Sequence, residues 1–177
     1  AKDSGVKRFG IHMMTGSNNL EPYFFAEIVD KLMMIAGDIF KELDIIPEYI
    51  DIGGGFGIPY YDGEEELNVE ATGEKVAKVF IENCDKYGFG RLKLILEPGR
   101  YLAGNAGYLV TSVTAIKESY KKFVGLDAGM NFLIRPALYN AFHRVRVYGK
   151  DDYTEKVNLC GQICENSDIF AKNILMP

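Results

Sequence analysis

The chain has 177 residues, of which 47% are apolar and 25% charged, and its formal net charge is −5. This composition is typical of a globular protein with a sizeable core and excludes an intrinsically disordered chain. Because the balance is acidic and no basic cluster exceeds Lys121-Lys122, we expect no nucleic-acid partner.

Cysteine usage indicates the redox environment. The chain has 3 cysteines, an odd number, with no signal peptide and no apolar run long enough to span a bilayer. We therefore expect a reduced, cytoplasmic protein with no membrane segment. Cys160 and Cys164 lack the spacing of a zinc knuckle, and no second Cys or His pair complements them, so no metal site is expected.

Strand and helix signals alternate in the first half of the chain. Short apolar runs predict strands at 8–13, 49–52 and 92–96, and apolar residues at helical spacing predict helices at 21–43 and 69–87. Such a βαβαβ order implies parallel strands joined by right-handed crossovers.

The pattern changes near residue 105. Strands are predicted at 108–117, 122–126, 145–148 and 156–159, without long helices between them. We therefore expect an α/β domain at 1–104 and a β-rich domain at 105–177. Three βα units are too few to close a (β/α)8 barrel, which needs about 250 residues, so the chain is expected to be part of a longer protein.

Two motifs in the α/β part favour anion binding. DIGGGFG (51–57) places three glycines at the end of a strand, where backbone N–H groups can surround a phosphate; a tight turn is the alternative. The spacing is not that of a dinucleotide-binding fingerprint. Ser17, in TGS before a helix, could offer its hydroxyl to the same phosphate or be an ordinary turn serine.

Charged groups follow the third strand and the β-rich segments. EPGR (97–100) holds Glu97 and Arg100, which could serve a ligand or form an ion pair that braces the loop. In DAGMNFLIRPALY (127–139), Arg135 suits bidentate capture of a carboxylate, with a structural salt bridge as the alternative. Asp127 is expected to be structural.

A further motif, CENSD (164–168), places the Cys164 thiol beside Glu165 in a polar turn. A lone cysteine usually fills a core, and Cys84 and Cys160 are expected to do so.

In this order, HMMTGS (12–17), DIGGGFG, EPGR, DAGMNFLIRPALY and CENSD resemble the fold-type III pyridoxal-phosphate (PLP) decarboxylases, which have an alanine racemase-like barrel. The resemblance covers about residues 8–177 and is strongest to the diaminopimelate decarboxylase branch. It implies the C-terminal part of a PLP-binding (β/α)8 barrel followed by the first part of a β-sandwich. The lysine that carries PLP in this family lies on an earlier strand absent here, so the chain alone is expected to be inactive.

The resemblance also implies roles for single residues. PLP would be bound by Ser17, Gly55, Glu97, Pro98, Gly99 and Arg100, with Glu97 at the pyridine nitrogen. The substrate would be bound by Arg100, Arg135, Tyr139 and Glu165. Cys164 would supply a proton in the active site of the other subunit of a homodimer. The implied reaction is decarboxylation of meso-2,6-diaminopimelate to L-lysine and carbon dioxide, a step of lysine biosynthesis.

One position departs from the family pattern. The family's HxHxGS motif has a second histidine that stacks on the PLP ring, and here that position is Met14. A thioether can contact an aromatic face but cannot accept a proton or form a charged hydrogen bond. His12 and His143 are expected to be packed, structural residues.

Met14 leaves open a related decarboxylase acting on ornithine, arginine or carboxynorspermidine. A separate alternative is a non-catalytic homologue that regulates a partner enzyme, although the intact Cys164, Glu97 and Arg100 count against it.

Overall fold

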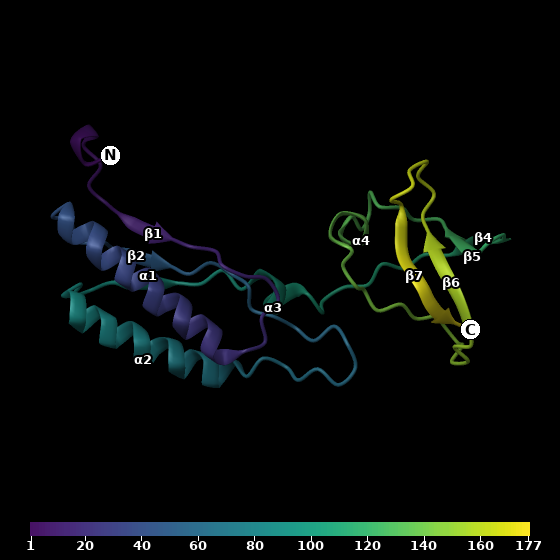
Figure 1. Cartoon of the computed structure of the whole chain (residues 1–177), viewed down its shortest axis with the longest axis horizontal. Helices are drawn as coiled ribbons and strands as arrows, with labels where there is room; N and C mark the ends of the chain where they lie inside the picture. The colour runs from purple at the N-terminus through teal and green to yellow at the C-terminus, as the bar shows by residue number, and fades with distance from the viewer. The chain divides into compact units, whose positions relative to one another are not determined.

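The chain forms two compact units, Ala1–Gly107 and Tyr108–Pro177 (Figure 1). Each unit has its own hydrophobic core. This computed structural model describes all residues, 1–177. No helix in it has both the length and the apolar composition needed to cross a membrane.

The first unit is a parallel α/β layer. After a 3₁₀ turn, η1 (Lys2–Ser4), its elements are β1 (Gly10–His12), α1 (Pro22–Glu42), β2 (Tyr49–Asp51), α2 (Val69–Tyr87), β3 (Lys93–Ile95) and α3 (Gly99–Ala103). The strands form a parallel sheet in the order β1-β2-β3. The predicted order and strand direction are therefore confirmed, whereas α3 was not predicted.

Helices α1 and α2 lie side by side against the sheet (Figure 1). Helix α1 begins with Pro22. An N–H at this first position would find no acceptor within the helix, and proline has no N–H. The helix buries an apolar face from Phe25 to Phe40. α2 begins at the Asn68 cap, whose side chain accepts from the Ala71 N–H at 2.9 Å, and ends at Gly88 in the left-handed conformation.

The second unit is a mixed sheet with one short helix. Its elements are β4 (Val113–Glu118), β5 (Lys122–Leu126), α4 (Arg135–Tyr139), β6 (Glu155–Cys160) and β7 (Ile169–Met176). The sheet order is β4-β5-β6-β7, with β5 and β6 parallel and the other neighbours antiparallel. The expected fold class, α/β followed by β, is confirmed.

Two strand predictions in this unit need correction. Residues 145–148 form no strand, although Val145 and Val147 pack against the core. Their alternating side chains have the period of a strand, but no neighbouring strand pairs with their backbone. The strand predicted at 108–117 begins only at Val113, where the pairing with β5 starts, and β7 and α4 were not predicted.

Asp127 joins the segment before β4 to the end of β5. Its carboxylate accepts from the Thr111 hydroxyl and, at 2.8 Å, from the Ser112 N–H, while its own N–H donates to the Ser112 carbonyl at 3.1 Å. The Thr111 hydroxyl and then the Ser112 N–H lower the pKa of Asp127. This structural role agrees with the expectation from the sequence.

Candidate functional site

Three polar side chains meet at the carboxyl ends of the parallel strands. Register aligns His12 with Asp51 and Asp51 with Ile95. Because side chains alternate between faces, Glu97, two residues beyond Ile95, returns to the face of His12 and Asp51. Pairing extends this far, since the Glu97 N–H donates to the Gly53 carbonyl at 2.8 Å.

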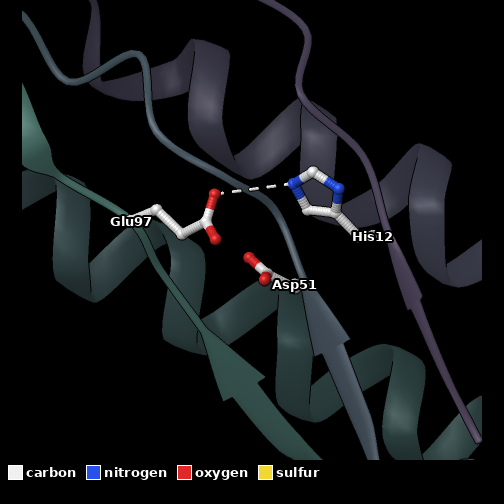
Figure 2. Close-up of side chains that lie close together, drawn as sticks. All are labelled: His12, Asp51 and Glu97. Carbon is white, nitrogen blue, oxygen red and sulfur yellow. Dashed lines mark ion pairs between the residues drawn. The ribbon is translucent and has the colours of Figure 1, made fainter.

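The resulting cluster contains an imidazole and two carboxylates (Figure 2). Nε2 of His12 lies 3.6 Å from Oε2 of Glu97, and one ligand atom of each of the three residues lies within 4.8 Å of the others. Asp51 is buried and accepts from the Gly53 N–H at 2.9 Å, whereas His12 and Glu97 are exposed. Such a set could hold a cation or the charged ring nitrogen of an organic cofactor.

This geometry corrects the interpretation of two residues. His12 is not a packed strand residue: half of its side chain is exposed, and its Nε2 faces the Glu97 carboxylate. The Glu97–Arg100 ion pair considered as an alternative is not formed. Arg100 is therefore not neutralised by the carboxylate that precedes it.

The backbone N–H groups of Gly53, Gly54 and Gly55 differ in their hydrogen-bond partners. The Gly53 N–H is bonded to Asp51 and the Gly54 N–H faces the Met14 sulfur at 3.2 Å, whereas the Gly55 N–H has no protein acceptor. Gly55 has φ +94°, and a Cβ there would lie 2.9 Å from the Gly16 carbonyl oxygen. The position therefore demands glycine for both conformation and space.

The loops after β1 and β2 lie against each other and bring Ser17 close to Gly55. Asn19 donates its N–H to the Gly55 carbonyl at 2.8 Å and accepts from the Gly57 N–H at 2.9 Å. The Ser17 nitrogen lies 3.8 Å from where a Gly55 Cβ would be. Two of the predicted phosphate-binding residues are thus neighbours.

Helix α3, which follows the end of β3, packs against the loop that follows β2. Glu97 and Pro98 precede the helix, and Gly99 and Arg100 form its first turn. A Cβ on Gly104 would lie 2.6 Å from Ile58, so α3 packs closely on the loop that follows β2. The Arg100 guanidinium lies over the Tyr60 ring, 5.8 Å from its centroid.

Arg135 and Tyr139 form a second pair, on α4 of the other unit. They are four residues apart, so they share one face of the helix, and the Arg135 guanidinium lies 5.8 Å from the Tyr139 ring centroid. No salt bridge involves Arg135, so the structural ion pair considered from the sequence is not formed. A half-buried arginine beside an exposed phenol is suited to an anionic ligand.

Cys164 and Glu165 lie in the loop between β6 and β7, and both are exposed. Cys84 packs against the first core, as expected. Burial, and then the charge of Asp168, raises the pKa of the half-buried Cys160.

Two acidic residues were missed by sequence reasoning. Asp51 was quoted only as part of the glycine motif, and Asp168 only as the end of CENSD, yet both are buried. Asp51 lies beside His12 only through the register of β1 and β2, which no local pattern contains. Nothing in the sequence distinguishes Asp168 from an exposed turn aspartate.

Known proteins with similar sequences and structures match nearly the whole chain. The family described as pyridoxal-dependent decarboxylase, C-terminal sheet domain, matches residues 26–177. Diaminopimelate decarboxylase of Methanothermobacter thermautotrophicus is 43% identical over 179 residues, which is 100% of this chain and 42% of that protein. Diaminopimelate decarboxylase of Thermoplasma acidophilum is 45% identical over 168 residues, 95% of this chain and 40% of that protein.

A solved structure agrees with these matches. The crystal structure of diaminopimelate decarboxylase from Helicobacter pylori complexed with L-lysine has a TM-score of 0.76 and 32% identity. The match covers 95% of this chain and 40% of that one. The chain thus spans about two fifths of the length of these relatives. With a family match that includes both units, the chain belongs to the pyridoxal-dependent decarboxylases.

Proposed function

We propose that the protein containing this chain decarboxylates meso-2,6-diaminopimelate to L-lysine and carbon dioxide with PLP as cofactor. Two relatives named diaminopimelate decarboxylase match 95–100% of the chain at 43–45% identity. The observation that carries the choice of substrate is Arg135, a half-buried cation without a carboxylate partner that lies beside Tyr139.

The strand ends of the first unit fit the phosphate of PLP. Gly55 leaves its N–H without a protein acceptor, and Ser17 lies next to it. Arg100, on the helix that packs on the same loop, supplies a cation that no carboxylate neutralises. Backbone N–H, hydroxyl and guanidinium are the groups that commonly bind phosphate.

Glu97 fits the ring nitrogen, with Pro98 and Gly99 beside it in the cofactor site. When bound, PLP supplies a protonated ring that accepts the electron pair left behind as carbon dioxide departs. An anionic Glu97 would favour the protonated ring nitrogen. His12, whose Nε2 lies 3.6 Å from the Glu97 carboxylate, is a second side chain beside the proposed site of the ring nitrogen.

Arg135 and Tyr139 would bind the carboxylate of the substrate that does not react. A guanidinium forms two parallel hydrogen bonds with a carboxylate, and a phenol can donate a third. Diaminopimelate has such a distal carboxylate, whereas ornithine does not. Glu165 would bind the distal amino group of the same substrate, and Arg100 could also contact the substrate.

Cys164 would donate a proton from its thiol to the substrate carbon that has lost carbon dioxide. Its exposed position in the β6–β7 loop leaves it accessible to a second subunit. We propose a homodimer in which this loop completes the active site of the partner. A cytoplasmic location, expected from three free cysteines, belongs to the same proposal.

The test uses the full-length protein, with its N-terminal strands, and follows lysine formation from meso-diaminopimelate. Wild type should form lysine, and Arg135→Ala should lower kcat/KM for diaminopimelate by about 100-fold or more, since a charge-assisted bidentate contact is lost. Arg146→Ala, an exposed arginine of the same unit, is the control and should retain activity.

Other outcomes would redirect the assignment. If Arg135→Ala leaves kcat/KM for diaminopimelate unchanged, the distal-carboxylate role is wrong. A PLP absorbance band without lysine formation would favour a decarboxylase for ornithine, arginine or carboxynorspermidine. Absence of PLP binding would favour the regulatory homologue.

A further inference from the structure

Asp168 is a buried acid at the end of the loop that carries Cys164 and Glu165. It is 3% exposed. Its Oδ1 accepts from the Met130 N–H at 2.6 Å, and its Oδ2 accepts from the Ile163 N–H at 2.7 Å. One carboxylate therefore bonds to two loops, 127–134 before α4 and 161–168 between β6 and β7.

Two glycines make room for this carboxylate. A Cβ on Gly161 would overlap Oδ2 of Asp168, and a Cβ on Gly129 would lie 3.2 Å from the same oxygen. Each glycine comes from one of the two loops. The carboxylate thus occupies a space that a side chain at position 161 would fill, and Gly129 lines the other side of that space.

Backbone bonds join the same two loops around Asp168. The Gly161 N–H donates to the Asp168 carbonyl at 2.9 Å and closes the β6–β7 loop. The Gln162 N–H donates to the Ala128 carbonyl at 3.2 Å and ties that loop to the one before α4. The loops are therefore held together at a buried polar centre.

Both loops lead directly to residues of the proposed site. Cys164 follows Ile163, whose N–H is bonded to Asp168. The other loop runs from Met130 to Arg135, the first residue of α4. Displacement of the carboxylate would release both segments at once.

We propose that Asp168 is a positioning residue that fixes the Cys164 loop against the loop leading to Arg135. The inference rests on the proposed function for its catalytic consequence, but not for the structural coupling itself. Asp168 touches no substrate; it acts through the two N–H groups that it accepts. A carboxylate is required because both of its oxygens must accept, whereas an amide would turn an N–H₂ group toward one donor.

The test is Asp168→Asn in the full-length protein, read by amide hydrogen exchange, PLP affinity and steady-state kinetics. An unsatisfied buried donor should raise exchange in loops 128–134 and 161–168 together, by about 10-fold or more. With diaminopimelate, kcat should fall and KM rise, and the Kd for PLP should stay unchanged, because the proposed PLP-binding residues lie in the first unit.

Glu155→Gln is the matched control. It removes a carboxylate that pairs with Lys122 at the start of β5 and β6, whereas the Asp168 loop follows the end of β6. It should leave exchange in both loops unchanged. Gly161→Ala, which would press a methyl group against the carboxylate, tests the same contact if Asp168→Asn does not fold, and should loosen both loops.

The proposal is overturned if exchange rises in only one loop, rises equally throughout β4–β7, or does not change. If the wild-type protein forms no lysine, the proposed function fails, but the exchange result still decides whether Asp168 couples the loops.

Discussion

At the scale of single residues, Gly55 combines two demands that no other residue type meets. Its φ is +94°, and a Cβ would lie 2.9 Å from the Gly16 carbonyl oxygen. Gly63 has nearly the same backbone conformation, φ +89°, but nothing lies within 4 Å of a Cβ there. The two positions therefore separate conformational strain from steric contact.

We expect Gly55→Ala to lower the free energy of unfolding by about 2–4 kcal/mol, from strain plus contact, and to weaken PLP binding. Gly63→Ala should cost about 1–2 kcal/mol, from strain alone, and leave PLP affinity unchanged. Urea unfolding and PLP titration of the full-length protein measure both quantities. Equal losses in the two variants would mean that the contact with Gly16 carries no energy.

Single residues also show the limit of reasoning from sequence. Motif order predicted candidate roles for Gly55 and Glu97, but His12 was interpreted as a packed residue. Its contact with Glu97 joins residues 85 positions apart. Such a contact depends on the register of three strands, which local patterns do not contain.

At the scale of elements, Asp127 links the β4 side of the second sheet to the end of β5 through Thr111 and Ser112. These bonds lower its pKa below the ordinary value of 3.8, because they favour the charged form. Between the folded and unfolded pKa values the unfolded chain binds more protons. The bonds therefore stabilise the fold above about pH 4, and this contribution is lost as pH falls through the lowered pKa.

The expected result is a difference in unfolding free energy between wild type and Asp127→Asn that is present at pH 6 and shrinks toward pH 3. Urea unfolding of the full-length protein at several pH values measures it. Asp152→Asn, at an exposed position outside the helices and strands, is the control and should show no such trend. A difference that grows on acidification would contradict the assignment.

Long helices were predictable as elements, whereas strand limits in the second unit were not. Helix α2 was predicted at its observed ends, 69–87, from its apolar period. In the structure the Asn68 cap and Gly88 agree with those ends. The segment 145–148 has a strand-like pattern, but a strand exists only where a partner backbone accepts its hydrogen bonds.

At the scale of the whole molecule, the proposed dimer makes a quantitative prediction. If Cys164 serves the partner's active site, Glu97→Ala and Cys164→Ala damage opposite sides of each shared site. Equal mixing and reassociation of the two full-length variants should then restore about one quarter of wild-type activity, because half of the dimers contain one intact site of two.

Each variant alone is the control and should be nearly inactive under the same mixing protocol. If Cys164 instead acts within its own subunit, every site in the mixed dimer carries one lesion. No recovery of activity after confirmed subunit exchange would therefore contradict the shared site.

The sequence by itself determined the βαβαβ order, the change to a β-rich second part and the motifs that identify the family. Hydrophobic period, caps and glycine runs are local properties, so they can be recognised without coordinates. Tertiary structure alone decided that His12 faces Glu97, that Gly54 rather than Gly55 uses its amide within the protein, and that Asp168 is buried. These features depend on strand register and on contacts between distant loops, which form only when the chain has folded.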